Sequence, residues 1–213
     1  MTTQAAKKTT PTLSIEKQYS KSVCGIDEAG RGPLAGPVLA ACVYIPEKHY
    51  NKRFIAEIND SKKLSMKKRE NLFLQIQKHC GFGIGIAKAE EIDTLNIHNA
   101  TLLAMRRAYQ EMCNDFTIKP AISLIDGLYA PDINCECETI KRGDSISCSI
   151  AAASILAKVT RDRIMLRLHN QYPHYGWERN AGYGTAEHIA AINEHGITEY
   201  HRRSFSPIKQ YKS

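Results

Sequence analysis

The stretch VCGIDEAGRGP, residues 23–33, indicates both the fold and the chemistry of this chain. Its first four residues form a short apolar run, which predicts a buried strand. Asp27 and Glu28 follow directly, and two adjacent carboxylates at a strand end repel each other. Hard divalent cations such as Mg²⁺ bind through carboxylate oxygens and would remove that repulsion. The next turn, Gly30-Arg31-Gly32, offers unobstructed backbone N–H groups and a positive charge, which suit a sugar-phosphate ligand. The stretch therefore predicts metal-assisted chemistry on a phosphodiester.

Two further acids follow predicted strands. Residues 121–125 form an apolar run that ends on Asp126, and the predicted strand 135–140 leads through a short turn to Asp144. If these strands adjoin the first one, four carboxylates meet at one sheet edge, where they would repel each other without cations. With two divalent ions about 3.5–4 Å apart, the same cluster would cleave a phosphodiester. Each acid also has a simpler interpretation, since Asp126-Gly127 is typical of a turn and Asp144 can cap a helix.

The charge balance favours a polyanionic partner. The 213 residues suit one domain and carry 29 Lys and Arg against 22 Asp and Glu, a net charge of +7. Residues 60–70 and the tail from residue 201 are basic, whereas residues 126–144 are acidic. Basic flanks around an acidic patch fit a site where carboxylates hold metal ions and the flanks bind phosphates.

Cysteine usage and hydropathy point to a cytoplasmic protein. The seven cysteines are scattered and lack the spacing of a zinc site, so we expect reduced thiols. No apolar stretch is long enough to span a membrane, and the polar N-terminus lacks the apolar centre of a signal peptide. We therefore expect a soluble, cytoplasmic protein.

The remaining pattern predicts strands and helices interleaved in one α/β or α+β domain. Residues 1–20 read as a flexible leader, and residues 21–213 as a single catalytic domain. Strands are expected at residues 23–26, 38–45, 82–86, 121–125 and 135–140. Helices are expected at residues 65–79, 93–113, 145–167 and 185–195.

Seven motifs stand in an order and spacing that resemble bacterial ribonuclease HII, from about residue 23 to residue 207. They are DEAGRGPL (27–34), NDSKKL (59–64), LIDG (124–127), KRGDS (141–145), AASILAKVTRD (152–162), GYGT (182–185) and HRRSF (201–205). The resemblance implies a ribonuclease H-like α/β fold. Its mixed five-stranded sheet would be flanked by helices, with a small C-terminal helical extension at about residues 185–213. One departure is visible, because residues 145–150 contain no acid where some relatives carry Glu.

The resemblance also implies an activity. Such an enzyme hydrolyses the RNA strand of RNA–DNA hybrids and cuts 5′ of single ribonucleotides in duplex DNA. It requires Mn²⁺ or Mg²⁺, leaves 3′-hydroxyl and 5′-phosphate ends, and serves to remove misincorporated ribonucleotides and RNA primers. We expect it to act as a monomer.

Motif by motif, the resemblance assigns roles to individual residues. Asp27, Glu28 and Asp126 would be metal ligands and Asp144 the fourth acid. The backbone of Gly30, Arg31 and Gly32 would read the ribose 2′-hydroxyl. Tyr183 would stack on the deoxyribose past the junction.

Basic side chains outside these roles have two interpretations. Lys62 and Lys63 belong either to a solvated surface or to a phosphate contact, and Arg202 and Arg203 either to a solvated tail or to a phosphate clamp. We favour phosphate contact for both pairs. Two alternatives for the whole chain are a ribonuclease HIII-like hybrid nuclease and a non-catalytic nucleic-acid-binding protein. The clustered acids argue against the latter because they repel phosphate.

Overall fold

A mixed five-stranded sheet forms the centre of the protein, as predicted. In this computed structural model, which describes residues 10–211, the strand order is β3-β2-β1-β4-β5. The strands are β1 (Val23–Ala29), β2 (Val38–Tyr44), β3 (Gly81–Ala87), β4 (Ile122–Asp126) and β5 (Glu136–Ile140). The pairs β1–β2 and β2–β3 are antiparallel, whereas β1–β4 and β4–β5 are parallel.

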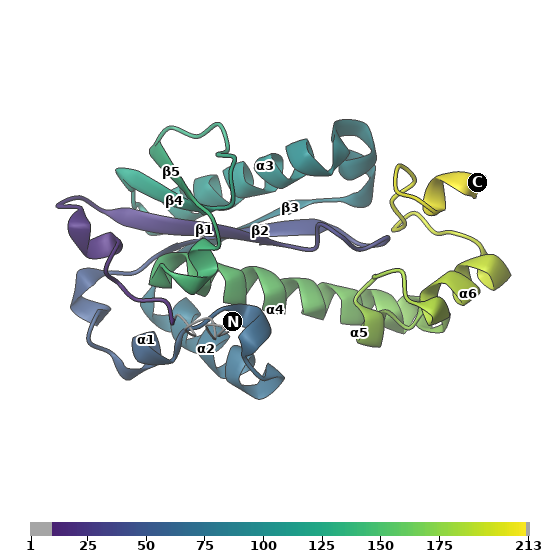
Figure 1. The fold of residues 1–213 in the computed structure, drawn as a ribbon, viewed down its shortest axis with the longest axis horizontal. Coiled ribbons are helices and arrows are strands. Elements are labelled where there is room, and N and C mark those ends of the chain that lie inside the picture. The colour runs from purple at the N-terminus through teal and green to yellow at the C-terminus, as the bar shows by residue number, and fades with distance from the viewer. Residues whose placement is uncertain (1–9, 212–213) are drawn as a thin grey trace, which may run out of the picture.

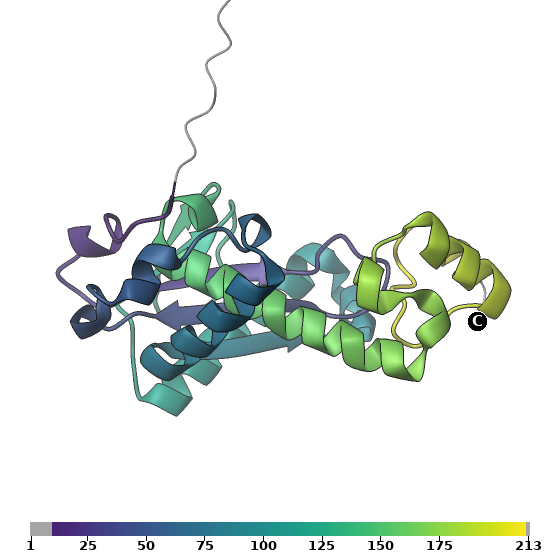
Figure 2. The ribbon, with the colours of Figure 1, turned by 90° about the horizontal axis from the view of Figure 1, so that it is seen from below.

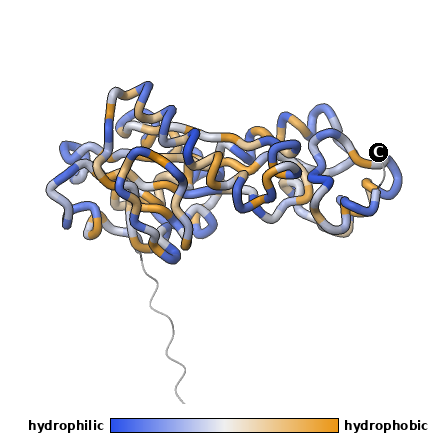
Figure 3. The backbone as a smooth tube through the Cα atoms, turned by 90° about the horizontal axis from the view of Figure 1, so that it is seen from above, coloured by the Kyte–Doolittle hydropathy of each residue, from blue (hydrophilic) through white to orange (hydrophobic). Residues whose placement is uncertain are grey.

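Helices cover both faces of this sheet (Figure 1). They are α1 (Arg53–Glu57), α2 (Met66–His79), α3 (Ala89–Phe116), α4 (Cys148–Gln171), α5 (Trp177–Asn180) and α6 (Ala186–His195). One apolar cluster joins the sheet to α3, and another joins it to α2 and α4. Figure 3 shows apolar residues concentrated in the middle of the main body. No helix of residues 10–211 is long and apolar enough to cross a membrane.

Glycines let the two long helices approach the sheet closely. A Cβ atom on Gly25 would lie 2.3 Å from the backbone nitrogen of Ile150 in α4, and one on Gly85 would lie 1.8 Å from the carbonyl oxygen of Ala104 in α3. Both distances are too short for any side chain. The alternation of large and small residues at 82–86 therefore reflects a helix resting directly on the strand.

Helix α3 begins earlier than the sequence pattern predicts. It starts at Ala89 and contains one residue with left-handed backbone geometry, Asn96, at φ 66°. Glu91 stabilises the early start, since its carboxylate accepts a hydrogen bond from the Lys88 N–H at 2.9 Å and pairs with Arg107 at 2.7 Å. The predicted boundary at residue 93 missed this first segment.

Residues 10–20, which the sequence suggested were part of a flexible leader, pack against the start of α4. Glu16 is only 3% exposed. Its Oε1 accepts hydrogen bonds from the Ser147 hydroxyl at 2.6 Å and from the backbone and hydroxyl of Ser149 at 2.9 and 2.8 Å. Residues 1–9 lie outside the described part of the chain, so the rest of the predicted leader stays a prediction.

The C-terminal extension sits at the far end of α4, beyond the sheet (Figure 2). It contains α6 and also α5, which lies before the expected start at about residue 185. The extension has an apolar cluster of its own, in which Tyr175, Trp177 and Ile192 pack against Met165 and Leu168 of α4. The last helix is expected to start at Thr185, and Thr185 is the residue that caps α6. The extension is thus anchored to the same helix that covers the sheet.

Candidate active site

The strand register brings two of the predicted acids together. Ile26 of β1 is paired with Ile125 of β4 in the parallel ladder. The residues that follow, Asp27 and Asp126, therefore stand next to each other on adjacent strands. Parallel strands end at the same edge of a sheet, so these two of the four acids meet there as expected.

A turn before α4 brings the fourth acid to this edge. The Gly143 N–H donates a hydrogen bond to Asp126 Oδ1 at 2.7 Å, which fixes the short 3₁₀ helix that contains Asp144. A Cβ atom on Gly143 would lie 2.5 Å from the Ile150 side chain. A larger residue at this position would have to displace the end of the Ile150 side chain beneath the turn that carries Asp144.

Burial and mutual repulsion raise the pKa values of three of these acids. Asp27 is 5% exposed, and its burial raises its pKa well above the usual range, with further increases from the nearby Glu28 and Asp126 charges. Burial also raises the pKa of Glu28, although the Arg31 charge opposes this. The pKa of Asp144 is raised by burial and by the carboxylates of Asp60 and Asp126.

Each of the four carboxylates accepts a hydrogen bond from a donor close to it in the chain or in space. The pairs are Asp27 Oδ1 with the Glu28 N–H (2.7 Å), Glu28 Oε1 with Arg31 (3.4 Å), Asp126 Oδ1 with the Gly143 N–H (2.7 Å) and Asp144 Oδ1 with the Ser145 hydroxyl (3.4 Å). Within residues 10–211, no three acid, histidine or cysteine side chains are grouped closely enough to form a complete metal site. The donor set consists only of carboxylate oxygens, from the buried Asp27 and Asp144 and the partly buried Glu28 and Asp126, and it has the chemistry that Mg²⁺ and Mn²⁺ prefer.

The predicted ribose-reading turn lines a cleft of about 350 Å³ beside Glu28. Gly30, Arg31, Gly32 and Tyr183 all contribute to its wall. The Tyr183 ring is half exposed, and its Cε1 lies 3.3 Å from the position that a Cβ of Gly32 would take. The structure therefore brings the turn and the aromatic ring together, although they are about 150 residues apart in the sequence.

The two predicted lysines differ in their surroundings. Lys62 lines the same cleft, and its charge lowers the pKa values of both Glu28 and Asp144. Lys63 instead pairs with Asp60 at 3.6 Å and donates to the Ser145 hydroxyl at 3.3 Å. Lys62 thus faces the acids, whereas Lys63 fixes the turn that carries Asp144.

The prediction that Arg202 clamps a phosphate is wrong. Its side chain is fully buried and donates to the carbonyl oxygens of Gly36 (3.0 Å), Arg31 (2.8 Å) and Gly30 (2.5 Å). The motif HRRSF did not reveal which of its two arginines points inward. Arg203 is exposed, and its backbone N–H donates to Asp93 at 2.9 Å. Its phosphate contact stays a prediction.

Several residues of the cleft had no predicted role. Ser61, Ser154, Lys158 and Arg161 line it as well, and Asp60 raises the pKa of Asp144. All of them fall within the quoted motifs NDSKKL and AASILAKVTRD. The helical spacing of Ser154, Lys158 and Arg161, at intervals of four and three residues, was the available signal that they share one face.

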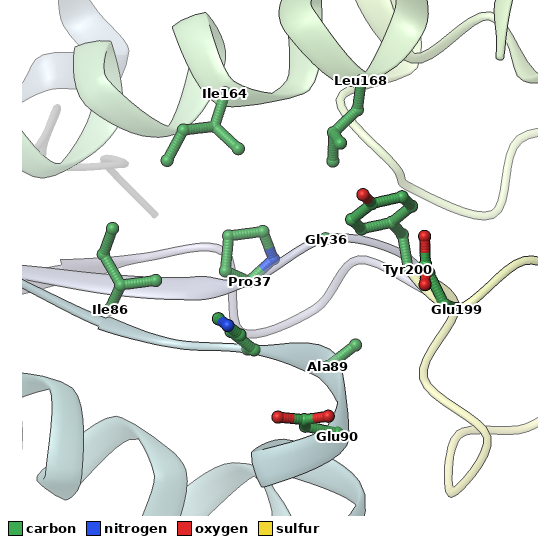
Figure 4. A pocket seen from close by; sticks show the side chains of 10 residues that line it. Gly36, Pro37, Ile86, Ala89, Glu90, Ile164, Leu168, Glu199 and Tyr200 are labelled. Atoms are coloured by element: carbon green, nitrogen blue, oxygen red, sulfur yellow. The ribbon is translucent and has the colours of Figure 1, made fainter. Parts of the chain in front are cut away.

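A second cleft has a volume of about 400 Å³ and a different set of lining residues (Figure 4). Its walls include Pro37, Ile164, Leu168 and Tyr200, between the start of α3, α4 and the extension. None of the four acids lines it. The candidate active site is therefore the smaller cleft beside Glu28.

Comparison with known proteins identifies the family of this chain. The family model described as ribonuclease HII matches residues 24–208. The chain belongs to the ribonuclease HII family. It is therefore an endoribonuclease of the ribonuclease H type. Ribonuclease HII of Paramagnetospirillum magneticum is 48% identical over 201 residues, which cover 94% of this chain and 98% of that protein. The Burkholderia thailandensis enzyme is 51% identical over 189 residues, covering 88% and 85%.

Solved structures share the fold. Ribonuclease H2 of Pyrococcus horikoshii superposes with a TM-score of 0.70 at 24% identity, covering 89% of this chain and 96% of that one. Bst-RNase HIII, solved in complex with Mn²⁺, gives a TM-score of 0.74 at 19% identity, covering 99% and 74%. The ribonuclease H-like fold predicted from the sequence is thereby confirmed.

Proposed function

We propose that this enzyme hydrolyses the RNA strand of RNA–DNA hybrids and cuts on the 5′ side of single ribonucleotides embedded in duplex DNA, leaving 3′-hydroxyl and 5′-phosphate ends. The observation that carries the proposal is the shared cleft, in which the Gly30-Arg31-Gly32 turn and the Tyr183 ring stand beside Glu28. This arrangement supports the proposal, because the turn would recognise the ribose next to the acid that would serve phosphodiester cleavage. The same reaction would remove misincorporated ribonucleotides and RNA primers, and we expect a monomer acting in the cytoplasm.

In this proposal Asp27, Glu28, Asp126 and Asp144 hold Mn²⁺ or Mg²⁺, with two ions bound when substrate is present. Such ions activate water and stabilise the leaving 3′-oxygen. The raised pKa values of Asp27, Glu28 and Asp144 support the assignment, since carboxylates that repel each other favour a nearby cation. The complex of Bst-RNase HIII with Mn²⁺, a protein of the same fold, is consistent with this choice of ion.

Recognition of the ribonucleotide would rest on the turn. A 2′-hydroxyl donates and accepts hydrogen bonds, and it distinguishes RNA from DNA. Backbone groups of Gly30, Arg31 and Gly32 can approach it closely because two of the three residues lack a side chain. Tyr183 offers an exposed ring for the adjacent deoxyribose, and Lys62 a positive charge for phosphate.

The decisive experiment uses duplex DNA with one ribonucleotide, in the presence of Mn²⁺ or Mg²⁺. We expect a cut on the 5′ side of the ribonucleotide, and a new 3′ end that a DNA polymerase extends. Asp27→Asn and Asp126→Asn should each reduce cleavage by at least about 100-fold. The matched control is Asp115→Asn, which changes an exposed acid near the end of α3.

Cleavage by either active-site variant at the wild-type rate, or cleavage in excess EDTA, would contradict the metal assignment. Binding without turnover would indicate a non-catalytic binder. Good cutting of long hybrids with poor cutting at a single ribonucleotide would favour an activity like that of ribonuclease HIII.

A further inference from the structure

Two buried arginines lie directly behind the ribose-reading turn. Arg161, on α4, donates to the carbonyl oxygens of Pro37 (3.1 Å), Ala181 (2.9 Å) and Ala35 (3.1 Å). Arg202, on the C-terminal extension, donates to those of Gly36, Arg31 and Gly30. Together the two guanidinium groups bind six main-chain oxygens in three segments of the chain.

This arrangement is costly. Within residues 10–211 neither guanidinium forms an ion pair with a carboxylate, and the side chains are 2% and 0% exposed. Burial lowers the pKa of Arg161 to about 10 and that of Arg202 to about 9, the latter also through repulsion by Arg161. Buried charges that repel each other destabilise a fold unless other groups compensate for them. The six carbonyl dipoles stabilise the two buried charges. The positions of these carbonyl groups therefore depend on the two arginines.

The geometry of the peptide bond determines where the N–H groups of the turn point. The peptide bonds after Gly30 and Arg31 are trans, so each carbonyl and the following N–H point to opposite sides. Because Arg202 draws the carbonyls of Gly30 and Arg31 inward, the N–H groups of Arg31 and Gly32 point away from it. In the described part of the chain, neither N–H donates a hydrogen bond. Both donors are therefore available to a ligand.

The shape of the turn depends on Arg161 as well. Gly30 has a φ of +93°, and a Cβ there would lie 2.0 Å from Arg161 Nε. The same guanidinium holds the carbonyl of Ala181, two residues before Tyr183. The turn and the aromatic ring are thus fixed against one pair of arginines.

We propose that Arg202 and Arg161 are positioning residues for ribose recognition. They fix the orientation of the peptide groups of the turn, so that two N–H donors stay directed toward the sugar without touching the substrate themselves. This inference rests on the proposed function. It adds that preference for a ribonucleotide over a deoxyribonucleotide depends on these buried side chains.

The test compares two duplexes of one sequence, identical except for one ribonucleotide. For each variant, KM is measured on the ribonucleotide duplex, and the inhibition constant of the all-DNA duplex is measured as a competitor. The ratio of the inhibition constant to KM reports the preference for ribose. If a substitution only lowers stability, a smaller fraction of the protein is folded. The apparent kcat then falls, but this ratio stays unchanged.

Arg202→Gln should reduce the ratio by at least tenfold, because the neutral amide cannot hold three carbonyls. Arg202→Lys and Arg161→Lys should reduce it by a smaller factor, since an ammonium group keeps the charge but not the planar arrangement of donors. The matched control is Arg179→Gln, which removes an exposed arginine of the extension that pairs with Glu178 and Glu187. Its ratio should equal that of the wild type.

A wild-type ratio in a folded Arg202→Gln protein would overturn the inference. If that variant fails to fold, Arg202→Lys replaces it, and an unchanged ratio in the lysine variant is equally contrary. If the wild-type enzyme itself prefers neither duplex and leaves the ribonucleotide uncut, the proposed function fails first. If the wild type prefers the ribonucleotide duplex and the arginine variants prefer it just as strongly, only the positioning role is refuted.

Discussion

At Asp27, folding and chemistry make opposite demands on one residue. Its carboxylate is 5% exposed, and its pKa is raised first by burial and then by the charges of Glu28 and Asp126. In the absence of a cation such a group weakens the folded state, because the unfolded chain solvates the charge better. The proposed metal-binding role would explain an acid that stability alone would not select.

We expect Asp27→Asn to make the protein more stable while it abolishes cleavage. In EDTA at neutral pH, the free energy of unfolding should rise by about 1 kcal/mol, since the amide removes a repelled charge and keeps an acceptor for the Glu28 N–H. Urea denaturation measures the change, with Asp115→Asn as the control. A less stable Asp27→Asn protein would show that the acid contributes to folding.

At the scale of single elements, the start of α4 depends on a residue more than 130 positions away. Ser147 caps the helix through the Ile150 N–H at 3.2 Å, and Glu16 adds a carboxylate that accepts three hydrogen bonds from Ser147 and Ser149. A negative charge at a helix N-terminus is favourable. The N-terminal segment thus stabilises the helix that follows the turn carrying Asp144.

Removal of this carboxylate should destabilise the protein. We expect Glu16→Ala to lower the free energy of unfolding by about 1–3 kcal/mol, since the serine hydroxyls and the Ser149 N–H lose a buried acceptor. Gln18 is an exposed residue of the short 3₁₀ helix Glu16–Gln18, and Gln18→Ala should change the free energy of unfolding little. Thermal or urea denaturation of both variants measures the difference. Equal stability of Glu16→Ala and wild type would mean that the contact contributes nothing.

This contact also shows where prediction from the sequence stopped. The five strands and the helix starts near residues 65 and 185 follow from local patterns, and Ser65 and Thr185 are the residues that cap α2 and α6. The start of α4 at Cys148, capped by Ser147, lies three residues after the expected start at residue 145. Glu16 lies in a Thr- and Lys-rich stretch that has no periodic pattern, so its burial depends on tertiary contacts that sequence alone does not show. The kink at Asn96 was missed for the same reason.

Some residues of the candidate site could likewise be predicted from the sequence, and others could not. Acids at strand ends could be located from the sequence because the apolar pattern of each strand is local, whereas the pairing of β1 with β4 joins residues 99 positions apart. The role of Arg202 could not, because an arginine next to a second arginine looks like a surface feature. Only the arrangement of the whole extension shows that one of them is buried beneath the turn.

At the scale of the whole molecule, two buried histidines, His188 and His201, connect segments of the extension through hydrogen bonds. The Trp177 indole N–H donates to His188 Nε2 at 3.0 Å, and His201 Nε2 lies 3.2 Å from the same nitrogen. The Thr198 N–H donates to His201 Nδ1 at 2.9 Å, so that nitrogen carries no proton. His188 Nδ1 lies 2.9 Å from the carbonyl oxygen of Tyr183. Both rings must therefore be neutral for the network to form.

Stability should consequently fall in mild acid. Burial, followed by the His188 ring, lowers the pKa of His201 to about 3, and burial also lowers the pKa of His188. An unfolded histidine has a pKa of about 6.5, so between these values the unfolded chain binds more protons. The contribution is complete above about pH 6.5 and is lost as the pH falls toward 3.

Urea denaturation between pH 8 and pH 5 tests this, and the free energy of unfolding should decline by up to about 1.4 kcal/mol per pH unit for each such group. His201→Gln should flatten the decline relative to the wild type. His98→Gln, which changes a ring outside this network, should not. A decline that is the same in all three proteins would exclude the histidine network as its cause.

The six oxygens that accept hydrogen bonds from Arg161 and Arg202 are main-chain carbonyl oxygens, which every amino acid has. Substitutions at Ala35 or Ala181 that the local space tolerates would therefore leave the anchor intact, whereas the two arginines have no equivalent replacement. Over evolutionary time the loop's side chains can diverge while its path is retained. The Arg31 side chain, which pairs with Glu28 at 3.4 Å, could therefore be varied without altering the backbone donors that face the ligand.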